Sequence, residues 1–318
     1  MFCAGAIAAC ASHGARQLPT ASLVLDFTPN AVHAGIYSAI ARGFDRARGV
    51  RLRVLVPSAT TDSIKLLEAG RVDFAILDIH DLAIARERGA DVVGIMAIVE
   101  RPLASVIAGP RFATPRALEG QTVGVTGVPS DTAVLDSIVH GAGGDADRLH
   151  TVTIGFDAVA DLLAHRVAAA TAFWNDEGVT LQRRRGGFHV FRVDAYGAPS
   201  YPELVLCAAA SRLRRDPALA RSVVGALLAG YRFTIAHPAH SARDLESLVT
   251  GLDPALVRAE LSALLPAFTG PDGRVGELDR ATLARWAAWE ARFRIVPRAP
   301  DPGAAFDRAF VSPGSGGA

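Results

Sequence analysis

The chain has 318 residues, a net charge of +1 at pH 7, and half of its residues are apolar. This length favours two lobes or one large α/β domain, and the apolar content is sufficient for a sizeable core. The balanced charge, without a long run of one sign, does not indicate a nucleic-acid or acidic partner. The cysteines Cys3, Cys10 and Cys207 follow no zinc or redox spacing, so we expect neither a metal nor a cofactor.

The first 21 residues predict a lipoprotein-type signal remnant and a tether. Ile7-Ala8-Ala9-Cys10 matches the small-residue pattern that precedes a lipid-modified cysteine, and the polar segment SHGARQLPTAS follows. The basic region and longer apolar run of a complete export signal do not precede it in the sequence. An ordinary alanine-rich stretch that contains a cysteine is the alternative interpretation. We therefore expect lipidation at Cys10 and an extracytoplasmic protein anchored to the cell membrane through that lipid.

Strands and helices alternate from residue 22 onward. Short apolar runs predict strands at 22–27, 51–56, 73–77, 91–99 and 103–109, with helical segments at 31–47, 62–69 and 81–88 between them. A second series predicts strands at 122–126, 149–154, 168–174, 188–193 and 203–210, with helices at 132–140 and 157–165. Beyond 211 the pattern is helical, and Asp216-Pro217 is typical of a helix start. Beyond the first 21 residues, no segment of the sequence reaches the length of about 18 apolar residues that a membrane span requires.

This pattern predicts an α/β protein with two lobes, each a mostly parallel sheet flanked by helices. Lobe 1 comprises 22–108 and 205–310 with the C-terminal helices, and lobe 2 comprises 109–204. The apolar segments at 103–109 and 203–210 are expected to cross between the lobes, with hinges near 108–110 and 203–207. The tail at 311–318 is expected to be disordered.

Candidate binding residues follow the strands, because ligands of open α/β sheets bind at the carboxyl ends of the strands. An aromatic subset, Phe27, Trp174 and Tyr201, predicts stacking against a flat, unsaturated ligand. The polar candidates at the same strand ends are Asn30, His33, Asp78, His80, Ser130, Asn175, Glu177 and Glu203. Asn30 and Ser130 also suit helix caps, Trp174 suits a core position, and each histidine suits a structural hydrogen bond.

Catalytic motifs are scarce. The chain has no G-x-S-x-G, H-E-x-x-H, P-loop or G-x-G-x-x-G sequence. Asp78 and His80 form a carboxylate–imidazole pair of a kind that often arises by chance. We therefore predict a binding protein without catalytic residues.

Longer segments carry a family resemblance. LDFTPNAVHAGIYSAIARGFDRARGV, AFWNDEGVTLQRRR and FRVDAYGAPSYPELVL resemble solute-binding proteins that serve thiamine-pyrimidine uptake, which usually have Trp at the position of Phe27. The resemblance extends over residues 22–300. It implies a two-lobed periplasmic-binding type II fold and delivery of a small aromatic, pyrimidine-type ligand to the permease and ATPase of an ABC importer. It also implies that Glu203 bonds the amino edge of the ring while Trp174 and Tyr201 pack against its face.

Alternatives within this resemblance stay open. Riboflavin-binding and sulfonate- or nitrate-binding relatives share the fold. The related fungal enzyme, an iron-dependent thiamine-pyrimidine synthase, has its reactive histidine where this chain has His80. Its cysteine-rich run is reduced here to Cys207, and its lysine near the histidine is missing, and both departures count against the synthase activity in this chain. A sensory lobe would need a fused output domain, for which the chain has no room.

Overall fold

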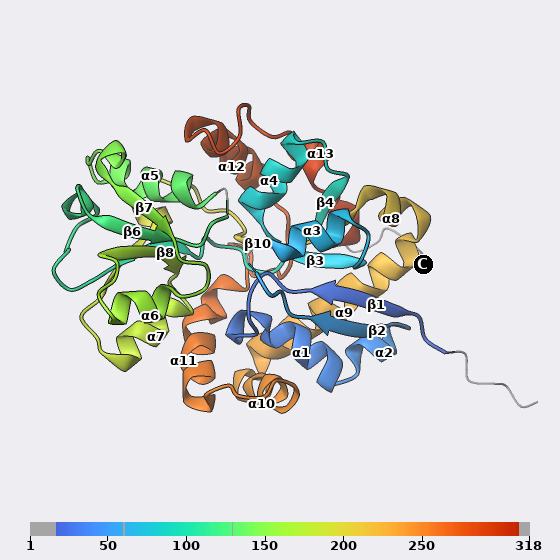
Figure 1. The fold of residues 1–318 in the computed structure, drawn as a ribbon. Helices are drawn as coiled ribbons and strands as arrows, with labels where there is room; N and C mark the ends of the chain where they lie inside the picture. Colours follow the sequence, from blue (N-terminus) through green and yellow to red (C-terminus); the bar gives the residue numbers. More distant parts are fainter. Residues whose placement is uncertain (1–16, 60, 129, 312–318) are drawn as a thin grey trace, which may run out of the picture.

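Two lobes lie side by side in the computed structural model, which describes residues 17–59, 61–128 and 130–311 (Figure 1). Cys10 and residues 312–318 of the expected tail lie outside the described residues. Each lobe contains one five-stranded sheet with helices packed against it. The prediction of a two-lobed α/β fold is therefore confirmed.

The first lobe is built on a sheet with the order β2-β1-β3-β10-β4. Strand β1 is parallel to β2 and β3, whereas β10 is antiparallel to both of its neighbours. Strand β1 begins at Thr20, so residues 20 and 21 belong to the sheet and not to the expected tether. The strands are β1 (Thr20–Val24), β2 (Arg51–Leu55), β3 (Phe74–Asp78), β4 (Val92–Ala97) and β10 (Leu204–Ala209).

The second lobe repeats this arrangement with the order β7-β6-β8-β5-β9. Strand β6 is parallel to β7 and β8, and β5 is antiparallel to β8 and β9. Its strands are β5 (Ala104–Ala108), β6 (Thr122–Val125), β7 (His150–Thr153), β8 (Ala169–Phe173) and β9 (His189–Arg192). Each lobe therefore has one antiparallel strand inside an otherwise parallel sheet.

The membership of β5 corrects the expected division of the chain. Residues 104–108 were expected in lobe 1, but they form the fourth strand of the lobe 2 sheet. An apolar strand flanked by two neighbours looks the same in sequence whichever sheet it completes. The segments that cross between the lobes are consequently 98–103 and 197–203, and we call them crossover 1 and crossover 2.

The helices cover the faces of both sheets. In lobe 2 they are η2 (Pro115–Leu118), α5 (Asp131–Gly141), η3 (Ala146–Arg148), α6 (Ala158–Leu163), α7 (Glu177–Arg184) and η4 (Val193–Tyr196). In lobe 1 they are η1 (Ala31–His33), α1 (Ala34–Ala41), α2 (Phe44–Ala47), α3 (Asp62–Glu68), α4 (Ile79–Glu87), α8 (Ala210–Arg215), α9 (Pro217–Ala236), α10 (Pro238–Leu248), α11 (Pro254–Leu264), η5 (Leu265–Ala267), α12 (Arg280–Arg292), α13 (Pro302–Ala305) and η6 (Arg308–Phe310).

Local signals explain several helix ends. Asp216 accepts a hydrogen bond from the Leu219 N–H at 3.0 Å and caps α9, as the Asp-Pro start signal predicts. The single helix expected over 31–47 is instead interrupted at Gly43, whose φ of 71° lies in the left-handed region. Among the described residues, α9 alone is long and apolar enough to pass a length and composition test for a membrane span. More than half of it is buried inside lobe 1, as in the core helix of a globular domain.

The last helices extend lobe 1 to both sides of the junction between the lobes. Figure 1 shows α11 beside α7 on one side and α12 beside α4 and α5 on the other. The ring of Phe293, which follows α12, lies 6.4 Å from the ring of His140 on α5. Lobe 2 is therefore held by these two helices as well as by the crossovers.

Helices α1 and α9 approach each other closely because glycines lie at their contact. A Cβ atom at Gly230 would overlap the backbone carbonyl oxygen of Gly35, and one at Gly35 would overlap the ring of Tyr231. Backbone atoms cannot move aside without shifting a whole helix. These positions therefore set the distance between the two helices.

Replacing Gly230 by alanine should lower the free energy of unfolding by about 2 kcal/mol or more, because the added methyl group forces α1 and α9 apart. Urea unfolding followed by circular dichroism would measure this loss. Gly225→Ala on the same helix is the matched control, since its Cβ would meet only the end of the flexible Arg48 side chain. Equal stability of the two variants would contradict the proposed helix contact.

Candidate ligand-binding site

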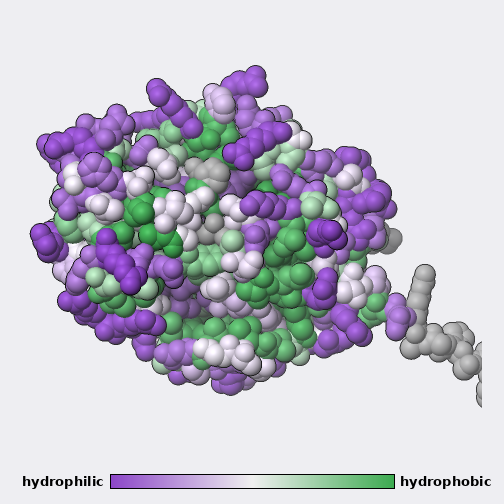
Figure 2. Space-filling view, in the orientation of Figure 1, coloured by the Kyte–Doolittle hydropathy of each residue, from purple (hydrophilic) through white to green (hydrophobic). Residues whose placement is uncertain are grey.

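A cavity of about 110 Å³ lies between the lobes, at the carboxyl ends of strands from both sheets. This volume leaves space for several water molecules or a small ring. Hydrophilic residues dominate the rim of the face in Figure 2, and hydrophobic residues gather toward its middle. The residues that line the cavity are Asp26, Phe27, Ser63, Ile64, Ile76, Leu77, Asp78, Asp81, Ala104, Ser105, Thr126, Val128, Ser130, Asp131, Val134, Phe156, Thr171, Ala172, Phe173, Asp176, Glu177 and Leu204.

Three contacts join the lobes around this cavity. The rings of Phe27 and Phe156 meet edge to face, with centroids 4.4 Å apart and an interplanar angle of 74°. The Asn30 side chain donates a hydrogen bond to Asp176 Oδ2 at 2.8 Å. The third contact is a bond from the Ser130 hydroxyl to Asp81 Oδ1 at 3.3 Å. Because both lobes contribute a partner to each contact, the cavity is closed by lobe-to-lobe interactions.

The loop after β1 is held by local hydrogen bonds. Asn30 caps η1 through Val32 N–H, and the Asn30 N–H donates to His33 Nδ1 at 3.2 Å. Because Nδ1 accepts, the proton of a neutral ring is on Nε2, which lies 2.9 Å from Asp26 Oδ1. His33 is fully buried and therefore positions Asp26, which lines the cavity, without reaching the cavity itself.

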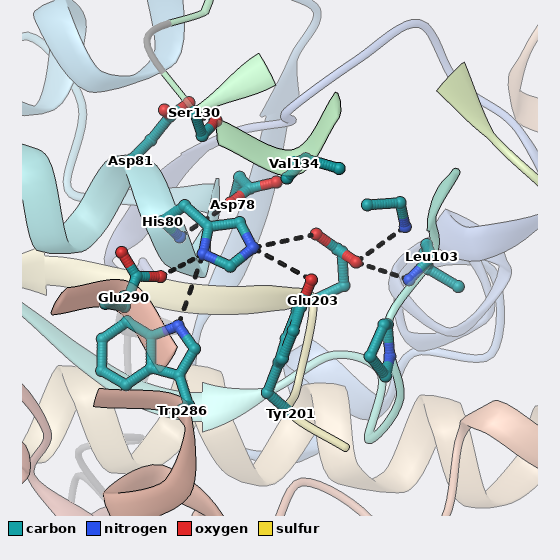
Figure 3. A network of polar contacts seen from close by, with 12 residues as sticks. Asp78, His80, Asp81, Leu103, Ser130, Val134, Tyr201, Glu203, Trp286 and Glu290 are labelled. Atoms are coloured by element: carbon teal, nitrogen blue, oxygen red, sulfur yellow. Dashed lines mark hydrogen bonds and ion pairs between the residues drawn. The ribbon is translucent and has the colours of Figure 1, made fainter. Parts of the chain in front are cut away.

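A buried polar network lies behind the cavity, around the His80 ring (Figure 3). His80 Nδ1 contacts a carboxylate oxygen of Glu290 on α12, and Nε2 lies 3.0 Å from the Tyr201 hydroxyl. Trp286 Nε1 adds a contact to Nδ1 at 3.4 Å. Glu203 Oε1 lies 3.8 Å from His80 Nε2. The network thus joins α4, crossover 2 and α12.

Glu203 also connects the two crossovers. Its Oε2 accepts hydrogen bonds from the backbone N–H groups of Leu103 at 2.5 Å and Ala104 at 2.8 Å. Glu203 belongs to crossover 2, whereas Leu103 ends crossover 1. The carboxylate is fully buried, so these two bonds form in a region from which water is excluded.

Burial and neighbouring charges act in opposite directions within this network. Burial opposes a charge on the His80 ring, but the carboxylates of Glu290 and Asp78 outweigh it and raise the pKa of His80 to about 10. Burial raises the pKa of Asp78 well above its usual value and also raises the pKa of Glu203. The network therefore favours a protonated imidazole, while Asp78 and Glu203 hold protons more tightly than exposed carboxyl groups do.

Candidate metal-ligating atoms come together within this network. Among the described residues, Asp78, His80 and Glu203 offer atoms within 4.8 Å of one another. Both nitrogens of His80 already have protein partners, and Glu203 Oε2 already receives two N–H groups. The arrangement is therefore explained by its internal hydrogen bonds.

The predicted site residues fall into three groups. Phe27, Asp78, Ser130 and Glu177 line the cavity, whereas Asn30 and His33 support it from the loop after β1. The remaining five, His80, Trp174, Asn175, Tyr201 and Glu203, do not line it.

The structure does not support the expected ring contacts of the last group. Tyr201 is fully buried in the core and bonded to His80. The indole of Trp174 donates to the Pro102 carbonyl at 2.9 Å, and Arg192 lies over its ring at 4.4 Å. Asn175 is buried with its Oδ1 unpaired among the described residues. Trp174 thus contacts crossover 1, Tyr201 belongs to crossover 2, and neither lines the cavity.

Several cavity residues were not predicted. They include Asp26, Asp81, Asp131, Thr171, Asp176 and Phe156. Most follow the same strands as the predicted residues, but one or a few positions away. Phe156 follows β7, a strand end from which no candidate was taken. Attention to every acidic residue within about five positions of a strand end would have found the carboxylates.

The comparisons with known proteins agree with this fold. A family model described as NMT1/THI5 like matches residues 30–241. A formylaminopyrimidine-binding protein of Halalkalibacterium halodurans is 29% identical over 282 residues, which are 86% of this chain and 84% of that protein. A 4-amino-5-hydroxymethyl-2-methylpyrimidine phosphate synthase of Legionella pneumophila is 24% identical over 175 residues, which are 54% of this chain and 55% of the enzyme.

Solved structures show the same architecture. The alkanesulfonate-binding protein SsuA of Xanthomonas axonopodis pv. citri, bound to MOPS, superposes with a TM-score of 0.72 at 15% identity. The match covers 91% of this chain and 98% of that protein. At this level of identity the likeness establishes the fold, which is the two-lobed fold of periplasmic binding proteins.

Glu203→Ala should lower the free energy of unfolding by about 3 kcal/mol, because it leaves the buried N–H groups of Leu103 and Ala104 without an acceptor. Tyr201→Phe is the milder control, since it removes only the hydroxyl contact with His80 and should cost about 1 kcal/mol. Chemical denaturation would measure both values. A Glu203→Ala loss no larger than that of Tyr201→Phe would contradict the crossover role of Glu203.

The pH dependence of stability should reveal the buried carboxyl of Glu177. Burial and the neighbouring Asp176 raise its pKa from 4.5 to about 8, so the folded state holds this proton more tightly than the unfolded chain. The stability that it contributes is present below pH 4.5 and is lost as the pH rises to about 8.

Glu177→Gln should reduce the decline in stability between these pH values by up to about 1.4 kcal/mol per pH unit. Urea unfolding at several pH values would measure the slope. Glu68→Gln, at an exposed position, is the control and should leave the slope unchanged. A slope that Glu177→Gln does not alter would show that this carboxyl is ionised in the folded protein.

Proposed function

The chain belongs to the NMT1/THI5-like family, and we propose that it is the solute-binding subunit of an ABC importer for a thiamine pyrimidine precursor. The observation that carries this proposal is the cavity between the lobes, whose wall both lobes supply. A binding protein of this architecture closes on its ligand by a hinge motion of the lobes. Two short crossovers and three contacts across the cavity suit such a motion.

The cavity lining suits a small, flat ring with amino substituents. Phe27 and Phe156 contribute aromatic rings to its wall, and Ile64, Val128 and Val134 add apolar surface. Carboxylates on both lobes can accept hydrogen bonds from ring amino groups. The formylaminopyrimidine-binding relative, which matches most of this chain, supports hydroxymethylpyrimidine or formylaminopyrimidine as the ligand. Riboflavin and sulfonates or nitrate are the alternative ligands.

An iron-dependent pyrimidine synthase is the competing function. The relatives include proteins named 4-amino-5-hydroxymethyl-2-methylpyrimidine phosphate synthase, and the one from Legionella pneumophila matches about half of this chain. His80, which stands where the fungal enzyme has its reactive histidine, is fully buried and does not line the cavity. Glu290 and Tyr201 already contact its two nitrogens. This burial supports a binding protein over an enzyme.

The same proposal includes an extracytoplasmic location for the protein. A solute-binding subunit delivers its ligand to a permease from outside the cytoplasm, and the Cys10 pattern supports a lipid anchor to the membrane. Cys10 lies outside the described residues, so the anchor is supported by the sequence pattern alone.

Isothermal titration with hydroxymethylpyrimidine, formylaminopyrimidine, riboflavin, taurine and nitrate would test the proposal. One of the two pyrimidines should bind with a Kd of about 1 µM or below. Phe27→Ala should weaken that binding about tenfold, because it removes an aromatic face from the cavity. Phe112→Ala, outside the cavity lining, should leave the affinity unchanged. Binding of riboflavin, taurine or nitrate in place of both pyrimidines would overturn the pyrimidine assignment.

A further inference from the structure

Although the two signs of charge are balanced along the sequence, the fold gathers positive charge at one end of lobe 2. Strand β5 ends at Ala108, which pairs with Ala169 at the start of β8 and with His189 at the start of β9. The segments that follow β5, precede β8 and precede β9 therefore meet at the same end of the sheet. These segments, 109–112, 164–168 and 182–189, carry the side chains that we call the basic patch, which are Arg111, His165, Arg166, Arg183, Arg184, Arg185 and His189.

Acidic residues do not neutralise the basic patch. None of its three segments contains Asp or Glu. Arg166 forms an ion pair with Asp161 at 2.8 Å, whereas the side chains of Arg183 and Arg184 form no hydrogen bond or ion pair with any described residue. Because the whole chain has a net charge of +1, the five arginines of the patch leave the rest of the chain net negative. The patch is thus a local concentration of charge in a nearly neutral molecule.

The adjoining segment before β6 does not reverse this charge. It contains Glu119, but Arg148 Nη1 lies 2.6 Å and Arg116 Nε 3.8 Å from the oxygens of that carboxylate. The acidic residues Asp145 and Asp147 precede β7, which is at the opposite edge of the sheet from β9. The carboxylates at this end of lobe 2 are therefore paired or lie toward the other edge.

The ends of two helices account for only part of the basic patch. Arginines in the last turn of a helix, such as Arg183 and Arg184 of α7, interact favourably with the helix dipole. Arg111 belongs to no helix. His165 follows the end of α6 with a φ of 56°, in the left-handed conformation for which glycine is the usual residue. The turn after α6 thus carries a basic ring at a position that favours glycine.

The basic patch is exposed and spread over a surface. All five of its arginines are exposed, and none lines the cavity, which β8 reaches at its other end with Phe173. Neighbouring residues on a helix point in different directions, so Arg183 and Arg184 do not converge on one small anion. An array of separate anionic groups over a wide surface therefore suits the patch better than a single small anion, and contact with it leaves the cavity free.

We propose that the basic patch docks lobe 2 on a membrane surface that contains anionic phospholipids. A guanidinium group stays charged and binds phosphate oxygens through two parallel N–H groups. Phospholipid head groups present many phosphates over an extended surface, which matches exposed arginines that point in different directions. The choice of a membrane over a nucleic acid rests on the proposed function, because the subunit of an importer works at a membrane surface.

Cosedimentation of the full chain with lipid vesicles tests this inference. At about 0.1 M salt the protein should bind vesicles of phosphatidylcholine and phosphatidylglycerol, and it should not bind vesicles of phosphatidylcholine alone. At about 1 M salt the binding should be lost, because the Debye length falls to about 3 Å. The chain is used without a lipid on Cys10, since such a lipid would insert into both kinds of vesicle.

Two sets of substitutions locate the contact. The triple variant Arg183→Gln, Arg184→Gln, Arg185→Gln should bind the anionic vesicles at least about tenfold more weakly, because each lost charge weakens the attraction to the surface. The matched control removes the same charge from three exposed arginines of lobe 1, by Arg88→Gln, Arg214→Gln and Arg215→Gln. Its binding should change by less than about twofold. Circular dichroism would confirm that both variants are folded.

The outcomes are separate from those of the ligand titration. Equal binding to both kinds of vesicle would overturn the inference, and so would an equal loss of binding in the two triple variants. If the protein binds neither kind of vesicle, the inference is also wrong, and the basic patch is left to an acidic protein surface. If no pyrimidine binds but the vesicle results are as expected, the proposed ligand fails and the membrane contact stands.

Discussion

The hydrogen bonds that Glu203 accepts from Leu103 and Ala104 are the constraint on which the arrangement of the two lobes depends. Only crossover 1 and crossover 2 connect the lobes covalently, and Glu203 joins one to the other. The His80 network attaches this junction to α12, whose Glu290 contacts the imidazole ring. A buried carboxylate is costly unless all of its partners are in place, so this junction tolerates few alternative geometries. It lies directly behind the cavity, and it keeps the two cavity walls in register.

The carboxylates that line the cavity have different partners from those at the junction. At the junction, carboxylates are paired with N–H groups and an imidazole, whereas cavity carboxylates such as Asp81 and Glu177 are hydrogen-bonded to neutral donors. A protein of marginal stability retains such an arrangement where binding compensates for it, because a ligand that prefers the folded state adds to the stability of that state. The acidic cavity is therefore a local loss of stability that a bound solute would recover.

The sequence predicted the strands and helices well and the positions of individual side chains less well. All ten strands occur near their expected positions, because apolar runs bounded by turn residues are a strong local signal. Helix α7 was missed, since its polar sequence EGVTLQRR offers only Val179 and Leu181 as apolar side chains to mark a buried face. The expectation that site residues follow strand ends led to Phe27, Asp78, Ser130 and Glu177, which line the cavity. The sequence pattern did not predict that the side chains of Tyr201 and Glu203 are buried in the core. Their partners, His80 and Leu103, lie about 100 residues away in the sequence.

The strand order also has a consequence for how the chain folds. Strands β3 and β4 are not neighbours, since β10 lies between them and pairs with both. During synthesis, residues 20–97 therefore emerge with a gap in their sheet, and the edges of β3 and β4 stay unpaired until residues 204–209 arrive. Lobe 2 has no such gap, because its five strands come from the continuous segment 104–192. Lobe 2 can therefore complete its sheet before lobe 1 can, although four of the five lobe 1 strands precede it in the sequence. The unpaired edges of β3 and β4 are therefore the part of lobe 1 that can pair with other strands during this interval.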